Sequence, residues 1–283
     1  MPRKAEAPVG GPVRETAPAK INLALHVTGR RADGYHLLDS LVAFADDGDR
    51  LTVELGPASV LHVAGPEAQG VPTDDANSIL RAAALMGAQV VVHLDKQLPS
   101  AAGIGGGSSD AAAALRAIRK LTGTALPDRP ERLGADVPVC LTPSAARMQG
   151  IGEVVTRVAL APLPAVLVNP RRAVATPAVF AALARADMPP MPDPLPPLLT
   201  AEDAILFLAA QRNDLEPAAI GLEPAIDAVL AALSRQPEVR LARMSGSGAT
   251  CFGLCETPEA AHRTALALAG LHPGWWVKET VLR

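Results

Sequence analysis

A cluster of four glycines in the first half of the chain restricts its fold more than any other feature. The cluster stands in the segment PSAAGIGGGSSD, which occupies 99–110. The residues before it, 90–94 (VVVHL), have the β-branched content of a buried strand. After it, apolar residues recur at helical spacing up to Leu121. The pattern therefore predicts a strand, a glycine loop and a helix in that order, with Ser109 and Asp110 in the first helical turn.

Such a loop is suited to hold a phosphate group. Glycines leave one surface without β-carbons, so backbone N–H groups can close around phosphate oxygens. The helix that follows adds unsatisfied N–H groups and the positive end of its dipole. The segment is not a Walker A loop, because no GK[ST] follows the glycines, and Ser108 stands where G-x-G-x-x-G needs its last glycine. A merely flexible turn is the alternative, and it leaves the position of the glycines between two strong elements unexplained.

The composition indicates a folded protein that acts on a small molecule. Of the 283 residues, 49% are hydrophobic and 19% charged, which favours one large or two modest domains. The formal net charge is -3 with both signs interleaved, so we expect no nucleic acid partner. The N-terminal residues lack the apolar core of a signal peptide, and no apolar run approaches the roughly 20 residues of a membrane span. We therefore expect a cytoplasmic protein with no membrane partner.

The rest of the chain alternates between strand-like and helix-like patterns, which predicts a mixed α+β protein without internal repeats. The predicted strands are 20–27, 166–168, 241–244, 250–254 and 275–282, and the predicted helices of the second half are 202–211, 223–233 and 258–269. A proline-rich stretch, 188–199, is incompatible with a regular helix or a central strand, so we expect a solvated loop. The three cysteines have no partners at metal-ligand spacing and are predicted to be buried structural residues.

Three segments, in chain order, resemble the three motifs of the GHMP small-molecule kinases. They are PAKINLALHVTGRRADGYH at 18–36, PSAAGIGGGSSDAAA at 99–113 and SGSGATCFG at 245–253. Within that superfamily AKINL, ADGYH and GADVP are similar to the 4-diphosphocytidyl-2-C-methyl-D-erythritol kinase family. The resemblance implies phosphorylation of the 2-hydroxyl of the cytidine-diphosphate-linked methylerythritol, with ATP and Mg²⁺, in the non-mevalonate route to isoprenoid precursors.

The resemblance also implies the architecture. It predicts an N-terminal domain with the ribosomal-protein-S5-domain-2-like fold and a C-terminal ferredoxin-like domain, with the ligands in the cleft between them. The expected division is a flexible tail at 1–16, an ATP-binding domain at 17–162 and a substrate domain at 163–283. Either a monomer or a homodimer is compatible with it.

Two residues are expected to carry the catalysis. By resemblance, Asp136 in GADVP takes the proton of the attacking hydroxyl, and Lys20 in PAKIN lies beside it. An ammonium next to a carboxylate can stabilise charge on the attacking and transferring oxygens. Taken alone, Asp136 is explained as a turn former and Lys20 as a solvated charge at a strand end.

Four further residues are expected at the substrate. By resemblance, Tyr35 stacks on the cytosine and His36 hydrogen-bonds it, which suits an aromatic ring and an imidazole with a donor and an acceptor. Asn22 shapes the same pocket, and Phe180 supplies a second face to the base. Ordinary loop packing explains Tyr35 and His36 as well, and one apolar helix face explains Phe180.

The resemblance assigns ATP to the loop residues Pro99, Ser100, Ala101, Ala102, Gly103, Ile104, Gly105, Gly106, Gly107, Ser108 and Ser109. The third motif, 245–248, either helps to hold phosphates or is a tight turn. Asp110 brings negative charge near the phosphates, so it is either offset by Mg²⁺ or points away. Asn77 lies in a plausible region for adenine, and no metal ligand is assigned. The alternatives are another GHMP activity, such as a homoserine, mevalonate or sugar kinase, and a non-catalytic nucleotide-binding regulator.

Overall fold

The structure is a computed structural model that describes residues 11–283. Its first half contains β1 (Val13–Arg30), β2 (His36–Leu55), β3 (Val60–Ala64), α1 (Ser78–Leu85), β4 (Val90–Asp95), α2 (Gly106–Thr122), a 3₁₀ turn (Pro130–Arg132), α3 (Val137–Cys140), β5 (Ala146–Gly150) and β6 (Val154–Arg157). Its second half contains β7 (Leu163–Asn169), α4 (Thr176–Ala181), α5 (Ala201–Ala209), α6 (Glu216–Leu222), α7 (Ala225–Ser234), β8 (Val239–Met244), β9 (Cys251–Cys255), α8 (Pro258–Leu271) and β10 (Trp276–Leu282).

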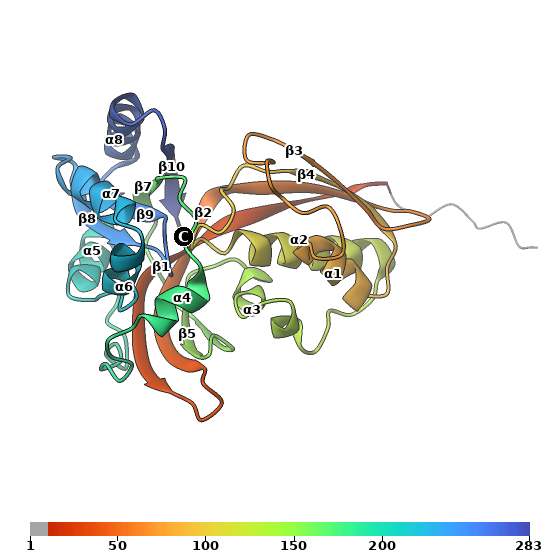
Figure 1. The fold of residues 1–283 in the computed structure, drawn as a ribbon, viewed down its shortest axis with the longest axis horizontal. Coiled ribbons are helices and arrows are strands. Elements are labelled where there is room, and N and C mark those ends of the chain that lie inside the picture. The colour runs from red at the N-terminus through yellow and green to blue at the C-terminus, as the bar shows by residue number, and fades with distance from the viewer. Residues whose placement is uncertain (1–10) are drawn as a thin grey trace, which may run out of the picture.

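The first half is built around the long antiparallel hairpin of β1 and β2. β4 pairs with one end of β2 and β5 with the other, while β3 lies parallel to β4 and α1 connects the two. Helices α1 and α2 cover one face of this sheet (Figure 1). The run of alanines at 111–114 in α2 is fully buried, and these small side chains let the helix lie close to β1.

The glycine loop and α2 have the predicted order. The helix begins at Gly106, after Gly105 in the left-handed conformation, so Ser109 lies at the end of its first turn and Asp110 follows it. Its other end is closed by Gly123, which is also left-handed.

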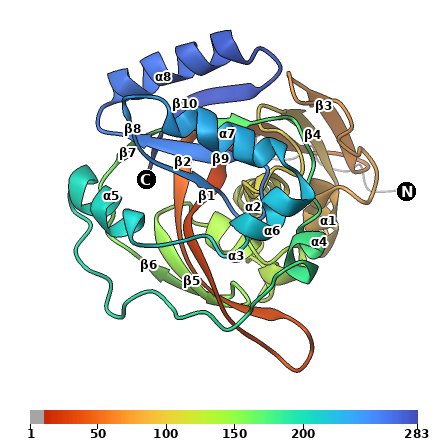
Figure 2. The same ribbon diagram turned by 60° about the vertical axis from the view of Figure 1, so that its left-hand side comes forward.

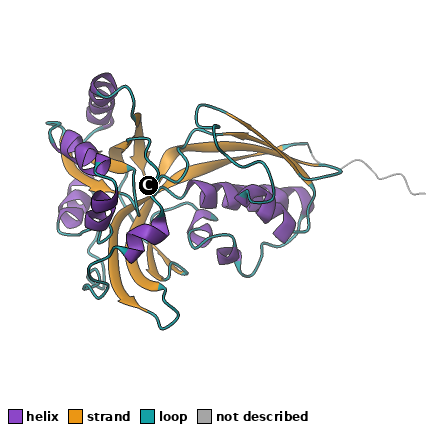
Figure 3. Cartoon of the chain, in the orientation of Figure 1, coloured by secondary structure: helices purple, strands orange, loops and turns teal. Residues whose placement is uncertain are grey.

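The second half has the order and pairing of a ferredoxin-like fold. Its four strands form an antiparallel sheet in the order β10-β7-β9-β8. Helix α7 precedes β8 and α8 connects β9 to β10, so the chain follows a β-α-β-β-α-β sequence with additional helices before α7. The prediction of a mixed α+β protein is confirmed (Figure 3).

The two halves share one sheet, and two hydrophobic clusters contain residues of both; the one that includes Ile21 is called the shared cluster. β10 reaches β2 through the pair Leu282 and Ala45, which joins the strands into a ten-stranded sheet. In the shared cluster, Ile21 and Leu41 of the first half pack with Leu167 and Phe252 of the second. The interface between the halves is therefore part of the core.

Two sequence predictions need correction, and one long strand was missed. The expected tail at 1–16 is too long, because β1 starts at Val13 and pairs with β2 from there, while 1–10 lie outside the described residues. The long strand β2 was not predicted. The proline-rich stretch has no regular element, as predicted, but it is not simply solvated, since Met191 and Leu198 are buried.

Candidate active site

A cavity of about 1310 Å³ lies where the two halves meet. Its wall is formed by β1, the glycine loop, the start of α3, helix α4 and the third motif. Of the residues predicted from the sequence, the following line it: Lys20, Asn22, Tyr35, His36, Ala101, Ala102, Gly103, Gly105, Gly106, Gly107, Ser108, Asp136 and Phe180. The fold thus brings residues that span 161 positions of the sequence together around one cavity.

Lys20 and Asp136 form an ion pair inside the cavity. The Lys20 ammonium donates to a carboxylate oxygen of Asp136 at 2.7 Å, and the two side chains are 5% and 32% exposed. Asp136 occupies the N-cap position of α3, yet its carboxylate caps no backbone N–H and is directed at Lys20 instead. A carboxylate with one oxygen on an ammonium and one facing open space can accept a proton from a bound hydroxyl.

The glycine loop packs directly on this pair. The backbone N–H of Lys20 donates to Ile104 at 2.9 Å, which fixes β1 to the loop. A Cβ added to Gly105 would lie 3.2 Å from the Cβ and 3.4 Å from the Cε of Lys20, so a larger residue there would press on the Lys20 side chain. The free N–H groups at the start of α2 therefore face the same space as the ion pair.

Four loop residues that were predicted to hold ATP lie outside the cavity wall: Pro99, Ser100, Ile104 and Ser109. Ile104 is a core residue, 1% exposed. The hydroxyl of Ser109 donates to the carbonyl of Pro18 at 2.7 Å, so it fastens α2 to β1 rather than facing a ligand. Ser78 was missed. It lines the cavity, and its hydroxyl donates to Gly107 at 2.7 Å.

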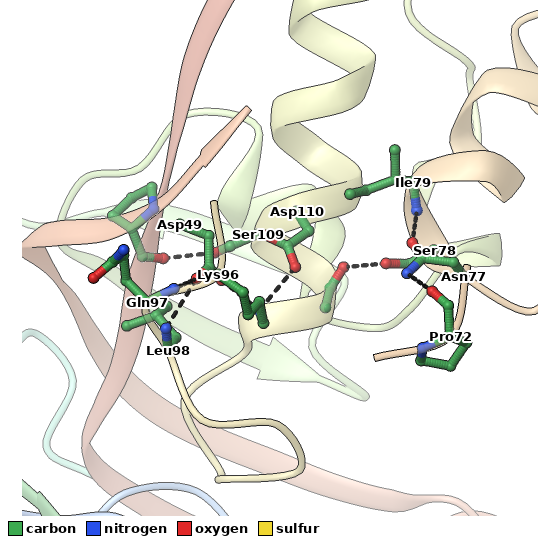
Figure 4. Close-up of polar contacts among 12 residues, drawn as sticks. Asp49, Pro72, Asn77, Ser78, Ile79, Lys96, Gln97, Leu98, Ser109 and Asp110 are labelled. Carbon is green, nitrogen blue, oxygen red and sulfur yellow. Dashed lines mark hydrogen bonds and ion pairs between the residues drawn. The ribbon is translucent and has the colours of Figure 1, made fainter. Parts of the chain in front are cut away.

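A buried charge cluster supports the loop from behind (Figure 4). The Lys96 ammonium lies between the carboxylates of Asp49 and Asp110, and all three side chains are 6% exposed or less. The other oxygen of Asp49 accepts the N–H groups of Gln97 and Leu98, which lead into the loop. Asp110 thus points away from the cavity, the second of the two alternatives for it.

The carboxyl of Asp110 is electrostatically unusual. Burial raises its pKa and outweighs the opposing charge of Lys96, and the neighbouring Asp49 carboxylate raises it further, to about 7. Burial lowers the pKa of Lys96, but Asp110 and Asp49 outweigh it, so the net direction is upward. The two carboxylates therefore favour the charged form of Lys96, whereas the pKa of Asp110 is moved toward neutral pH.

Asn77 has a structural role that the sequence did not reveal. Its side-chain oxygen accepts the N–H of Ile79 and its amide donates to Pro72, so it caps α1 (Figure 4). It is buried and does not line the cavity. Helix capping therefore explains why an asparagine stands at this position, and Asn77 does not face a ligand in the cavity.

The predicted base-binding residues gather at the far end of the cavity. The rings of His36 and Phe180 are stacked, with centroids 4.9 Å apart and planes inclined by 23°. Burial and the nearby Arg30 charge lower the pKa of His36, so the neutral ring offers a donor and an acceptor. Tyr35 is 62% exposed at the rim. Phe180 lines the cavity, whereas Val179 is buried in the core. The position of α4 is therefore compatible with both explanations of Phe180, a second face for the base and an apolar helix face.

The third motif lies against the glycine loop, although it was left out of the predicted site. The Ser245 hydroxyl accepts the N–H of Asn22 at 3.0 Å and donates to Gly103 at 3.0 Å. The Asn22 amide donates to Ser40 at 2.8 Å, which also lines the cavity and was missed. Ser247 lines the cavity as well. Small residues at 245–248 are needed here because two backbones touch.

No group of three or more His, Cys, Asp or Glu side chains suited to a metal ion occurs among residues 11–283. The carboxylates lining the cavity are Asp33, which pairs with Arg31 on its own loop, and Asp136. Mg²⁺ typically binds through one or two carboxylates plus substrate phosphates. The donor set therefore fits a magnesium ion that arrives with a nucleotide.

Known proteins agree with this geometry. Residues 76–142 match the GHMP kinases N terminal domain and 197–272 match the GHMP kinases C terminal domain. A protein of Dinoroseobacter shibae named 4-diphosphocytidyl-2-C-methyl-D-erythritol kinase is 59% identical over 100% of this chain and 99% of its own. The chain belongs to the 4-diphosphocytidyl-2-C-methyl-D-erythritol kinase family. As a member of this family of GHMP kinases, it is an ATP-dependent small-molecule kinase.

Other members and neighbours place the chain within the superfamily. A kinase of the same name from Cereibacter sphaeroides is 58% identical over 92% of this chain and 96% of its own. A crystal structure of 4-(cytidine 5'-diphospho)-2C-methyl-D-erythritol kinase superposes with a TM-score of 0.78 at 37% identity, covering 95% of this chain and 99% of that one. A homoserine kinase structure reaches a TM-score of 0.67 at 19% identity over 98% and 97% of the two chains, which shows the shared fold alone. The 4-diphosphocytidyl-2-C-methyl-D-erythritol kinase family is thereby separated from its alternatives.

Proposed function

We propose that this chain transfers the γ-phosphoryl group of ATP to the 2-hydroxyl of 4-diphosphocytidyl-2-C-methyl-D-erythritol, in the non-mevalonate route to isoprenoid precursors. The observation that carries the proposal is the Lys20–Asp136 ion pair packed on the glycine loop inside one cavity. A non-catalytic regulator has no need of a base and an ammonium at that point. The relatives' shared name supplies the substrate.

In the proposed reaction Asp136 accepts the proton of the attacking hydroxyl as the oxygen–phosphorus bond forms. Lys20 keeps the carboxylate in place at 2.7 Å and offsets negative charge on the attacking and transferring oxygens. The N–H groups of the glycine loop and of the first turn of α2 hold the phosphates. Positioning and electrostatics supply most of the catalysis, as is usual for phosphoryl transfer.

The cytidine end of the substrate is proposed to bind at Tyr35, His36 and Phe180. The neutral His36 imidazole hydrogen-bonds the base edge, and the aromatic rings of Tyr35 and Phe180 offer faces on which a pyrimidine stacks. Asn22 holds the wall between this end and the glycine loop through Ser40 and Ser245.

Mg²⁺ is proposed as the second cofactor. It would be held chiefly by the nucleotide phosphates at the glycine loop, since the free oxygen of Asp136 is assigned to the attacking hydroxyl, and it would neutralise phosphate charge.

The division at 162 and 163 is proposed to separate an ATP-binding half from a substrate half. A monomer or a homodimer is proposed as the oligomeric state. None of the helices in the described part of the chain is long and apolar enough to cross a bilayer. Because the reaction consumes ATP, we propose a cytoplasmic location.

The test is ADP release by the purified protein with ATP and Mg²⁺. We expect turnover with diphosphocytidyl-methylerythritol and none with homoserine, mevalonate or galactose, and loss of turnover when EDTA removes the metal. Asp136→Ala should lower kcat by about 10³-fold, because general base catalysis typically contributes about 10²- to 10⁴-fold. Asp128→Ala, at an exposed position on the loop before α3, is the control and should keep wild-type activity. Turnover with another acceptor would overturn the substrate assignment.

A further inference from the structure

The proline-rich segment between α4 and α5 connects the substrate end of the cavity to the opposite face of the sheet. We call residues 183–199 the strap. It begins where α4 ends, and its first part still borders the cavity through Leu183 and Ala186. From there it runs as a long loop to α5 (Figure 2). The established motifs assign no role to it.

The strap leaves the cavity at the edge of β1. The N–H of Met188 donates to Val27 at 2.9 Å, and the buried His26 imidazole lies with Nδ1 3.1 Å from the carbonyl of Pro189. Because a carbonyl can only accept, Nδ1 carries the proton. Successive residues of a strand face opposite sides. Leu25 lines the cavity, so His26 and the strap above it lie on the other face.

On that face a guanidinium clamps the strap just beyond Pro189, whose carbonyl also accepts from Arg212. Arg147 donates to both oxygens of Asp39, at 2.7 and 2.8 Å, and the two side chains are 7% and 2% exposed. The same guanidinium donates to the carbonyls of Met191 and Pro192, each at 3.3 Å, and to the Asp193 carboxylate at 3.2 Å. Asp39 in turn accepts the N–H of Met191 at 2.8 Å. This bidentate arrangement needs an arginine, because an ammonium has no planar fork of donors.

The clamp and the cavity are carried by the same strands. Leu38 and Ser40 flank Asp39 on β2, Met148 follows Arg147 on β5, and all three line the cavity. The strap is therefore held against the back of the strands that form the substrate wall.

Helix α4 packs on the core of the second half and is attached at both of its ends. It has six residues, of which only Val179 is buried. At its start the hydroxyls of Thr176 and Ser247 are 2.7 Å apart, and at its other end the chain continues into the strap. The ring of Phe180 that stacks on His36 is therefore carried by a short helix that continues directly into the strap.

We propose that Asp39 and Arg147 are positioning residues for the substrate: by clamping the strap they hold α4, and with it Phe180, in register with His36. The role assigned to these rings rests on the proposed function. The physical coupling from the clamp to α4 does not, and it can be measured without any ligand.

The test replaces Arg147 by Lys, which keeps the charge opposite Asp39 and removes the fork. We expect KM for the cytidine substrate to rise about ten-fold while kcat and KM for ATP stay within about two-fold of wild type. Amide hydrogen exchange in 178–182 of the ligand-free protein should become faster. Asp193→Asn alters only an exposed carboxylate of the clamp, at 83% side-chain exposure, and should shift both readouts in the same direction by a smaller amount without a risk of misfolding.

Arg243→Lys is the matched control. Arg243 is as buried as Arg147, at 7%, and its guanidinium binds the carbonyls of Leu23, Leu208 and Gln211 without touching the strap. It should destabilise the protein without a selective change in substrate KM or α4 exchange. Equal rises in both KM values for Arg147→Lys, or unchanged exchange in 178–182, would overturn the proposal. If the wild type shows no preference for the cytidine compound, the proposed function fails, and the exchange result still decides the coupling.

Discussion

Two carboxylates share one ammonium behind the glycine loop. Both oxygens of Asp49 have hydrogen-bond donors, because one of them also accepts two backbone N–H groups. One oxygen of Asp110, by contrast, is buried without a hydrogen-bond partner among the described residues. A buried and unpaired carboxylate oxygen favours the protonated form. The geometry therefore agrees with the upward shift of the Asp110 pKa.

Asp110→Asn should change how stability depends on pH. With a pKa of about 7 in the folded state against an ordinary value of 3.8, Asp110 holds a proton between these limits that the unfolded chain has released. Its contribution to stability is thus complete below about pH 4 and declines as pH rises to 7, by at most about 1.4 kcal/mol per pH unit. Asparagine cannot titrate, so the variant should lack this decline when unfolding in urea is measured from pH 5 to 8.

Asp128→Asn, at an exposed position, serves as the comparison and should follow the wild type at every pH. Parallel losses of stability in wild type and Asp110→Asn across this range would show that Asp110 is already ionised in the folded protein.

At the scale of elements, the glycine loop and the third motif determine each other's residues. A Cβ on Gly103 would lie 2.6 Å from the carbonyl oxygens of Ser245 and Gly248, well inside contact distance. The same two backbones are joined by the hydrogen bond from Thr250 to Ala102 at 3.1 Å. Glycines in both segments therefore serve the close contact between two backbones as well as ligand access.

Gly103→Ala should cost more than the backbone conformation alone. Gly103 and Gly123 both have φ of +72°, a region that costs other residues roughly 1–2 kcal/mol. Gly123 has nothing within 4 Å of an added Cβ, whereas Gly103 meets backbone. Overpacking adds about 1–3 kcal/mol, so Gly103→Ala should be the less stable variant in urea and should raise KM for ATP, while Gly123→Ala keeps wild-type KM. Equal losses in the two variants would mean that the third motif moves aside at no cost.

The sequence predicts an element well when neighbouring residues determine it, and poorly when contacts with distant parts of the chain determine it. The loop and α2 were predictable because glycines and helical spacing are local signals, and the resemblance of three motifs gave the α+β halves. The 2.7 Å contact of Lys20 and Asp136, 116 positions apart, follows from tertiary packing and could be expected only by resemblance. The strap was predicted as solvated because its prolines exclude regular structure, but the residues that hold it, Asp39 and Arg147, lie elsewhere in the chain.

At the scale of the molecule, the predicted boundary between the ATP-binding half and the substrate half does not divide the hydrophobic core. Ile21 and Leu41 belong to the predicted ATP-binding half and Phe252 to the predicted substrate half, yet they pack in one cluster. The backbone of Phe44 exchanges two hydrogen bonds with Arg283, at 2.7 and 2.9 Å, which fastens the last residue of the chain to β2. A cavity formed between halves with a common core has walls that lose their structure together.

The chain should accordingly unfold in a single transition. Both tryptophans, Trp275 and Trp276, lie in the second half, so their fluorescence reports on it, while amide exchange in α2 reports on the first. The two probes should give the same midpoint in urea, because neither half can expose its side of the shared cluster alone. Phe252→Ala, at a fully buried position, should cost about 3–5 kcal/mol and lower both midpoints together. A shift of the fluorescence midpoint alone would mean that the first half is stable without its partner, and the cavity could then open by unfolding of the second half.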